Sequence, residues 1–511
     1  MNFKTISLSV LLLTLLVGCG SAPTTPLASP ISASTTAPVS TQQIPGDAPH
    51  PSSVPTQAAP TATPQPEATS AAEVKIVATG PQLIVPNAHG LQAFSVDGTL
   101  VQTFAQAQPA LGRSLSEGIA PTGNLVAYIS GNNPMTPDRE GSGPLTLNLL
   151  DTRTGQLQPI TPLFSPEMEQ ALSAAGNDRT EATEAGIAIV FNDETLAWSP
   201  DGRYLAFIAA SDGPSSDVYS YNRDTGQINR LTDGLNQAAR LFWSPDSQWI
   251  IHEEVESFGT GAGWNVKAVW AAAPDGSGNR KLYDTEWSGD EVFIDWTTPD
   301  SFIVYTWSPI GLQDARVFSL STEEAQRIGP DFPVQAYAVD PNSQTQLYVV
   351  DDYTARENSL PGGLYFDSPS QQPQLIAQGN WYDVRWLPHA RIFFAKGESG
   401  VIGVALDGTT TEYSGEEALP IDSPDGAWLL AWGDGNYTSP IGLRLYTIDG
   451  ELRRDITQDS VAFATWAPDS TGVFYVSEDM LYYVAIPNGE QQLIAEDLIS
   501  SEAGSVGWVT P

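Results

Sequence analysis

Cysteine, histidine and basic residues are scarce in this chain of 511 residues. It has one cysteine, four histidines, and 22 lysines and arginines against 60 aspartates and glutamates. The single cysteine excludes a disulfide within the chain. Because binding to a nucleic-acid backbone needs clustered cations, the net charge of −38 excludes nucleic acid as a partner. An acidic surface of this kind serves solubility, or it attracts cations and basic partners.

Catalytic and metal-binding motifs are also missing. The chain has no Gly-x-Ser-x-Gly segment, which excludes the nucleophile elbow of α/β-hydrolases. Metal sites need several convergent histidines or carboxylates, and the histidines stand far apart at His50, His89, His252 and His389. Only His252 is followed directly by carboxylates. These absences favour a binding protein over an enzyme.

The N-terminal segment Met1–Gly18 is short and apolar, with one charge at Lys4. It is too short to span a membrane as a helix and is typical of a secretory signal. The segment Leu16-Val-Gly-Cys19 resembles the bacterial lipobox, which implies cleavage before Cys19 and acylation of that cysteine. The alternative is a chance cysteine in an ordinary signal peptide. We expect an extracytoplasmic protein, anchored by lipid to the bacterial cell membrane or the outer membrane.

Residues 19–72 continue from this cysteine through Pro, Thr, Ser, Ala and Gln, with only Asp47 and Glu67 charged. Such a composition cannot bury enough apolar surface to fold. We therefore expect a disordered tether between the anchor and a folded domain of residues 73–511.

A short phrase recurs along this domain. The clearest copies are Leu196-Ala-Trp-Ser-Pro-Asp-Gly202 and Leu241-Phe-Trp-Ser-Pro-Asp-Ser247, and weaker ones follow at Ile421–Gly426 and Thr465–Ser470. Trp198 and Trp243 are 45 residues apart, and the later tryptophan spacings are close to one or two such units. A period near 45 residues is typical of the four-stranded blade of a β-propeller. We predict an all-β propeller of antiparallel blades.

The clearest unit predicts four strands, at Thr195–Ser199, Tyr204–Ala209, Asp217–Asn222 and Gln227–Leu231, with proline in the turn after the first. An Ala-, Leu- and Glu-rich segment, Pro166–Ala175, predicts a short helix between two blades.

Nine candidate inner strands lie near residues 119, 196, 241, 294, 336, 384, 420, 464 and 506. Because a degenerate unit can be an insertion, and propellers usually have four to eight blades, we prefer eight blades, with seven or nine as alternatives. The last unit has only an inner strand, and the first segment has only later strands. Pairing of the two ends would close the ring.

The Trp-Ser-Pro-Asp-Gly phrase resembles the WD40-like repeat of TolB-type β-propellers, which also occurs in the propeller domains of prolyl-oligopeptidase-like proteins. The resemblance covers most of residues 82–510. It implies a cell-envelope role, since TolB itself is a soluble partner of envelope lipoproteins and membrane proteins. This chain departs from TolB in its own predicted anchor and in the absence of an evident N-terminal α/β domain.

Binding residues are expected in the loops between second and third strands, which gather on one face with the connections between blades. These loops are predicted at Gly131–Pro144, Ser211–Ser216, Glu253–Trp264, Trp307–Asp314, Asp351–Gly363 and Gly433–Gly442. The carboxylates and aromatics in these loops suit the binding of a glycan, a peptide or Ca²⁺. The alternative is that these are ordinary solvated acidic loops with no ligand. The candidate ligand-binding residues are His252, Glu253, Glu254, Glu256, Phe258, Trp264, Trp307, Asp351, Asp352, Tyr353, Asp434 and Tyr437.

The sequence therefore predicts a lipid-anchored module that binds an envelope protein or glycan, with no catalytic residue and no cofactor unless Ca²⁺ binds. The alternative is a lyase or hydrolase that processes polysaccharide or peptide with the same loops. The related oligogalacturonate-lyase propellers use a histidine-rich metal site, for which this chain has too few histidines.

Overall fold

The computed structural model describes residues 80–110, 115–131, 144–173, 181–191, 194–257, 264–285, 290–308, 311–413, 420–434, 441–498 and 506–510. The predicted signal segment, Cys19 and the predicted tether lie outside these residues, as do Phe258 and Tyr437. Among the described residues, no helix has the length and apolar character needed to cross a membrane.

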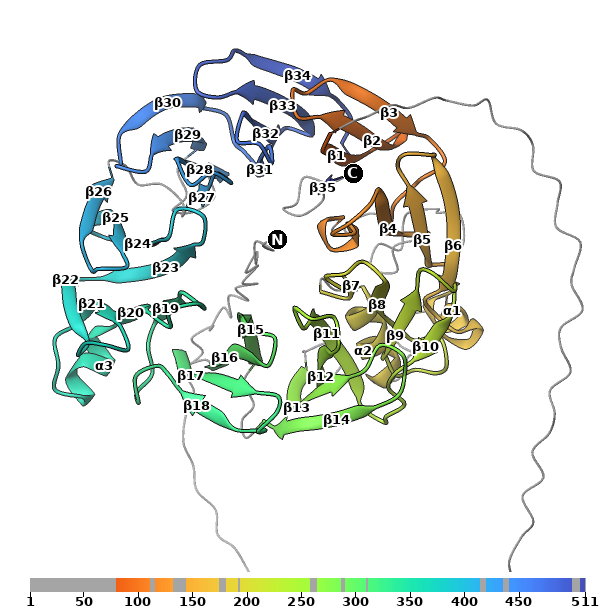
Figure 1. Cartoon of the computed structure of the whole chain (residues 1–511), viewed down its shortest axis with the longest axis horizontal. Coiled ribbons are helices and arrows are strands. Elements are labelled where there is room, and N and C mark those ends of the chain that lie inside the picture. Colours follow the sequence, from red (N-terminus) through yellow and green to blue (C-terminus); the bar gives the residue numbers. More distant parts are fainter. Residues whose placement is uncertain are drawn as a thin grey trace, which may run out of the picture. The chain divides into compact units, whose positions relative to one another are not determined.

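Nine antiparallel sheets follow one another around a ring (Figure 1). Eight have four strands, and the sheet β4–β6, which we number as the first blade, has three. In that sheet Ile119 forms an isolated antiparallel bridge to Val126, where the inner strand of the other blades would lie. The chain is therefore a β-propeller with nine blades, which confirms the predicted fold class.

The strands of the first five blades, from inside to outside, have the following bounds: β4 Leu125–Ser130, β5 Thr146–Asp151 and β6 Gln156–Pro162; β7 Leu196–Trp198, β8 Tyr204–Ala209, β9 Asp217–Asn222 and β10 Ile228–Arg230; β11 Gln237–Trp243, β12 Ile250–Ser257, β13 Trp264–Ala272 and β14 Asn279–Asp284; β15 Asp290–Thr298, β16 Ser301–Ser308, β17 Gly311–Ser319 and β18 Ala325–Arg327; β19 Ala336–Val339, β20 Gln346–Val350, β21 Gly363–Asp367 and β22 Gln374–Gln378.

The remaining four blades have these bounds: β23 Trp381–Leu387, β24 Ile392–Gly397, β25 Gly400–Ala405 and β26 Thr410–Tyr413; β27 Ile421–Asp422, β28 Trp428–Asp434, β29 Ile441–Thr447 and β30 Leu452–Thr457; β31 Phe463–Trp466, β32 Gly472–Ser477, β33 Met480–Ala485 and β34 Gln491–Ala495; β35 Gly507–Val509, β1 Gln82–Asn87, β2 Gly90–Ser95 and β3 Leu100–Phe104.

The blade count is nine rather than the preferred eight. The degenerate units near residues 336 and 420 are complete four-stranded blades, β19–β22 and β27–β30, and not insertions. The ring closes as predicted, because β35 pairs antiparallel with β1 and places Trp508 opposite Leu83. The two ends of the domain thus share one sheet, and closure leaves no inner edge unpaired there.

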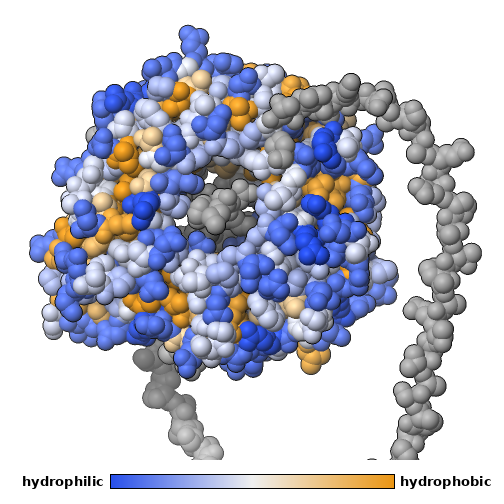
Figure 2. Space-filling model, viewed as in Figure 1, coloured by the Kyte–Doolittle hydropathy of each residue, from blue (hydrophilic) through white to orange (hydrophobic). Residues whose placement is uncertain are grey.

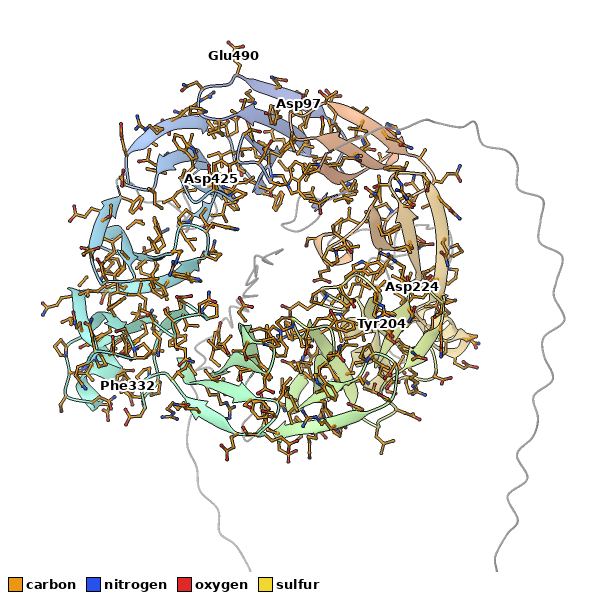
Figure 3. All side chains as sticks on the ribbon, viewed as in Figure 1. Asp97, Tyr204, Asp224, Phe332, Asp425 and Glu490 are labelled. Carbon is orange, nitrogen blue, oxygen red and sulfur yellow. The ribbon has the colours of Figure 1, made fainter. Side chains whose placement is uncertain are left out.

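Strand order separates two faces of the ring. Turns from first to second and from third to fourth strands emerge on one face, which we call the turn face. Second-to-third connections and the connections between blades emerge on the opposite face, which we call the loop face. Figure 3 shows Asp425, in a first-to-second turn, toward the inside of the ring, and Glu490, in a third-to-fourth turn, at its outer rim.

Within the described ranges, three α-helices interrupt the strands, and all belong to loop-face connections. The helices α1 Pro166–Ser173 and α2 Glu181–Val190 lie between β6 and β7, and α3 Asp352–Glu357 lies between β20 and β21. Helix α1 confirms the helix predicted at Pro166–Ala175, whereas α2 was not predicted. The mixture of Gly186 with Ile187, Ile189 and Val190 hides its periodicity, and these last three residues are buried against the second blade's core.

The repeated phrase forms a hydrogen-bonded turn. In the second blade, Ser199 Oγ donates to Asp201 Oδ1 at 2.6 Å and accepts the backbone N–H of Tyr204 at 2.9 Å. The same two bonds recur in the third blade with Ser244, Asp246 and Trp249, and in the seventh with Ser423, Asp425 and Trp428. The phrase is recognisable in sequence because each of its polar residues satisfies a backbone or side-chain group.

Neighbouring turns are also bonded to one another. The indole Nε1–H of Trp198 donates to Gly118 O, and that of Trp243 donates to Ala197 O, each at 2.8 Å. Both acceptors belong to the preceding blade. The first three blades are therefore tied to one another by buried hydrogen bonds, in addition to apolar packing between sheets.

Candidate functional site

The acidic run after His252 lies in a strand rather than a loop. The strand β12 extends to Ser257, so Glu253, Glu254 and Glu256 are strand residues, and Trp264 begins β13 opposite Ser257. Side chains alternate between the two faces of a strand, so consecutive glutamates point to opposite sides. The expectation that these residues converge in one loop is wrong for Glu253 and Glu254.

His252 and Glu254 lie on one side of the third blade. The His252 ring stacks on Trp270, with ring centroids 6.5 Å apart, and its Nε2 is 3.4 Å from Asn279 Oδ1. Trp270 Nε1–H donates to Glu254 Oε2 at 2.7 Å, and Asn236 Nδ2–H donates to the other oxygen. Glu254 is therefore held by two donors from elsewhere in its own blade and the preceding connection.

Burial controls the protonation of His252. Only 3% of the residue is exposed, and burial lowers its pKa to about 4. The imidazole is neutral at pH 7, because removal from water disfavours the charged form. His252 is therefore a neutral, buried polar group of the blade and not a charged surface residue.

Glu253 points to the other side and meets Arg240. Arg240 Nη1–H donates to Glu253 Oε1 at 3.2 Å, and Arg240 Nε is 3.3 Å from Glu194 Oε2 in the second blade. Arg240 is the extra residue of a β-bulge in inner strand β11 and has φ of 50°. Bulges of this kind turn a side chain out of its usual direction. The result is a pair of ionic contacts that link β11 to β12 and to the residue segment just before β7, which the sequence analysis missed.

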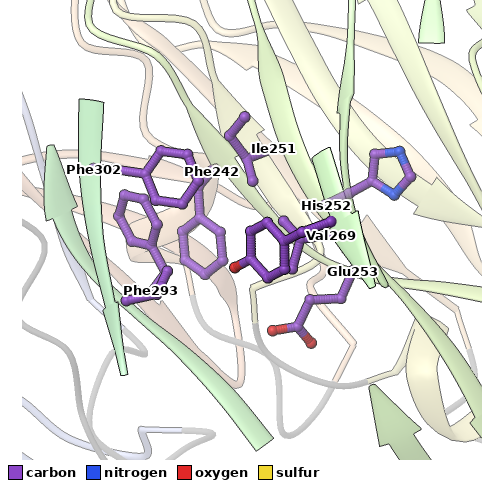
Figure 4. Close-up of a pocket in the computed structure, with 9 residues that line it drawn as sticks. Phe242, Ile251, His252, Glu253, Val269, Phe293 and Phe302 are labelled. Carbon is purple, nitrogen blue, oxygen red and sulfur yellow. The ribbon is translucent and has the colours of Figure 1, made fainter. Parts of the chain in front are cut away.

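A small apolar cavity lies beside Glu253. Its aromatic lining includes Phe242, Phe293 and Phe302, and it has room for about one water molecule. Figure 4 shows the His252 ring turned away from this aromatic group. The cavity is too small for an organic ligand, so the third blade's cluster is not a substrate pocket in this structure.

The second predicted cluster surrounds helix α3. Asp351 is the N-cap of this helix, and its carboxylate accepts the Thr354 backbone N–H at 2.7 Å. Asp352 is exposed, and Tyr353 is 67% exposed on the loop face. Asp351 therefore has a structural role as a cap, while the other two residues are free of the core.

The remaining candidates lie at strand ends. Trp307 is in β16 and Asp434 is in β28, and the positions of their side chains fall outside the described part of the structure. The described candidates are thus divided among the third, fourth, fifth and seventh blades. Among the residues described, no group of three or more His, Cys, Asp or Glu side chains is placed to hold a metal ion.

The surface is mixed rather than dominated by one patch. In the view of Figure 2, hydrophobic residues are scattered among hydrophilic ones over several blades. The largest exposures of apolar or aromatic side chains are those of Leu235, Tyr353, Leu100 and Leu493, at 102%, 67%, 50% and 47%. Leu235 and Tyr353 belong to loop-face connections, whereas Leu100 begins β3 on the turn face and Leu493 is in the middle of β34.

Comparison with known proteins supports the fold and little more. No family model matches the chain. It is 39% identical over 54 residues to the uncharacterized peptidase YuxL of Bacillus subtilis, and 29% identical over 104 residues to the uncharacterized protein Atu1656 of Agrobacterium fabrum. These matches cover 11% and 19% of this chain, and 8% and 33% of the two relatives.

Among solved structures, the chain is similar to a eukaryotic initiation factor. The TM-score is 0.51 with 14% identity, and the match covers 85% of this chain and all of the other. At that identity the likeness concerns the propeller fold alone.

Proposed function

We propose that this chain is a binding module of the bacterial cell envelope, anchored by lipid at Cys19, which holds a protein partner on its loop face. The resemblance to TolB-type repeats and the lipobox support the location. The acidic, histidine-poor composition supports a binding role over a catalytic one.

The contrast between the two faces carries this proposal. On the turn face, short repeated turns are bonded within and between blades, and they leave little room for variation. On the loop face lie all three described helices. A scaffold fixed at one face can present varied segments at the other, which is how loops on rigid folds usually bind.

The binding role is tested by capture of partners from a detergent-solubilised envelope extract. A variant in which residues 351–363, with helix α3, are replaced by a short glycine-containing turn should lose partners that the wild-type chain retains. The matched control leaves the loop face unchanged. It replaces Asp224, which is exposed in a turn-face hairpin, by Asn. Identical capture by all three proteins would contradict the proposed face.

The anchor has its own test. Replacement of Cys19 by Ala should move the protein from the membrane fraction to the soluble extracytoplasmic fraction. A Ser21→Ala variant keeps the cysteine and should remain in the membrane. Retention of the Cys19→Ala protein in the membrane would refute lipid anchoring.

An enzyme remains the competing proposal, because the Bacillus subtilis relative is described as a peptidase. Turnover of a peptide or polysaccharide library by the purified chain would favour that alternative if the Glu254→Gln variant lost it. The variant must fold as the wild type does. Under the binding proposal, no turnover is expected with or without divalent metal.

A further inference from the structure

We propose that a groove where the ring closes binds a lysine or arginine side chain from an extended segment of a partner protein. This inference rests on the proposed binding role and locates a contact for it. The groove has a volume of about 380 Å³ and is lined on its polar side by Asn87, His89, Gln92, Glu496 and Asp497, with Leu493 beside them.

The groove is built from both ends of the propeller domain. One wall is the end of β1 with the turn into β2, and the other is the end of β34 with the connection that follows it. The backbone N–H of Ala88 donates to Asp497 O at 3.1 Å, and Asn87 forms a bridge with Leu498. The groove therefore exists only when the ring is closed. It lies at loop-face connections, where the proposed function expects binding.

Asn87 fixes the shape of the groove. It is 3% exposed, and its Nδ2 donates to Gln92 Oε1 at 3.0 Å and to Glu496 O at 3.4 Å. Its Oδ1 accepts the His89 backbone N–H at 2.7 Å. Both walls are thus held by one buried amide, so little ordering is needed when a ligand enters.

The chemistry of the lining favours a cation. Glu496 and Asp497 are exposed, and neither lysine nor arginine is among the residues that line the groove. A bound ammonium or guanidinium group would form charge-assisted hydrogen bonds with these carboxylates. The volume is within the range of small-ligand sites, and it suits a side chain with adjacent backbone rather than a large ligand.

Two features favour a peptide over an amino sugar. The strand β34 is the outermost strand of the eighth blade and pairs only with β33 in the described sheet, so its other edge can bond to an extended backbone. Leu493, in the same strand, is 47% exposed. Its apolar surface can pack against the methylene groups of a lysine or arginine side chain.

The test uses the full chain in detergent at low ionic strength, with acetyl-Ala-Lys-Ala-amide as the probe in isothermal titration calorimetry. The matched probe has norleucine in place of lysine. We expect binding of the lysine peptide and at least about tenfold weaker binding of the norleucine peptide. The double variant Glu496→Gln and Asp497→Asn should weaken lysine-peptide binding by about tenfold or more. Asn tolerates the φ of 58° at position 497.

A matched control separates the groove from general acidity. The double variant Glu398→Gln and Asp331→Asn removes the same charge from exposed loop-face positions in the sixth blade and in the connection between the fourth and fifth blades, and it should bind as the wild type does. Equal weakening by both double variants, no binding of the lysine peptide, or binding of glucosamine but not of the peptide would each overturn the inference. Partner capture that still depends on residues 351–363 would then leave the proposed function standing.

Discussion

Replacement of Trp243 by phenylalanine should destabilise the propeller more than the same replacement of Trp466. Both residues are buried in inner strands, with exposures of 8% and 5%, so the loss of ring area is similar. Trp243 Nε1–H donates to Ala197 O at 2.8 Å, whereas Trp466 Nε1 is buried without a hydrogen-bond partner among the described residues. The first substitution removes a bond between blades, while the Ala197 carbonyl keeps its place in the ladder with Ala206. The second removes an unpaired donor.

The expected difference follows from the loss of that bond. One hydrogen bond within a protein contributes about 0.5–1.5 kcal/mol, so the free energy of unfolding should fall by about that much more for Trp243→Phe than for Trp466→Phe. Urea unfolding followed by far-ultraviolet circular dichroism measures the difference, provided that both variants have the same dependence on urea. Equal destabilisation of the two variants, or a larger effect at Trp466, would refute the claim that indole bonds tie the blades together.

Two further predictions concern a turn and a buried histidine. Gly202 and Gly226 have similar φ angles of 70° and 73°. A Cβ at Gly202 would lie 2.4 Å from Thr122 Oγ1, whereas a Cβ at Gly226 would meet no atom. Gly202→Ala should therefore lower the free energy of unfolding by about 1–3 kcal/mol more than Gly226→Ala, as measured by urea unfolding. Equal costs would contradict close packing of neighbouring turns. The pKa of His252 is about 4 when folded and about 6.5 when unfolded, so the unfolded chain binds more protons between these values and stability decreases as the pH is lowered through this range. Between pH 7 and 4.5 a loss of about 2–3 kcal/mol should be present in the wild type and absent in His252→Gln, and an unchanged loss in that variant would exclude His252 as its source.

The fold could be predicted because its repeat is local. Each of the nine candidate inner strands coincides with an innermost strand or, at Ile119, with a bridge in that place. The count of eight was preferred because a degenerate unit can be an insertion and propellers usually have four to eight blades. The seventh blade is one such degenerate unit, with no tryptophan in its phrase and an inner strand of only Ile421–Asp422. That blade keeps the Ser423 and Asp425 bonds, so the turn chemistry identifies a blade better than the tryptophan does.

The site was harder to predict because its contacts join distant residues. The run from His252 to Glu254 seemed to form one cluster, yet strand alternation sends Glu253 to Arg240 and Glu254 to Trp270. The bulge that directs Arg240 has no glycine or proline to mark it. The closing groove combines residues about 400 positions apart, and neither half has a motif, so only the structure brings Asn87 to Glu496.

The two faces of the propeller differ because the two ends of each strand have different roles. Hydrogen bonds such as those of Ser199, Trp198 and Trp243 fix one end of the blades, and each uses a side chain of the repeated phrase. The opposite ends can then differ in length and composition without disturbing how the blades pack, which explains why a helix such as α3 is accommodated there. The same argument requires that substitutions at the turns act on stability and those in the closing groove act on binding. A groove variant that unfolds the ring, or a turn variant that changes peptide affinity without changing stability, would contradict this division.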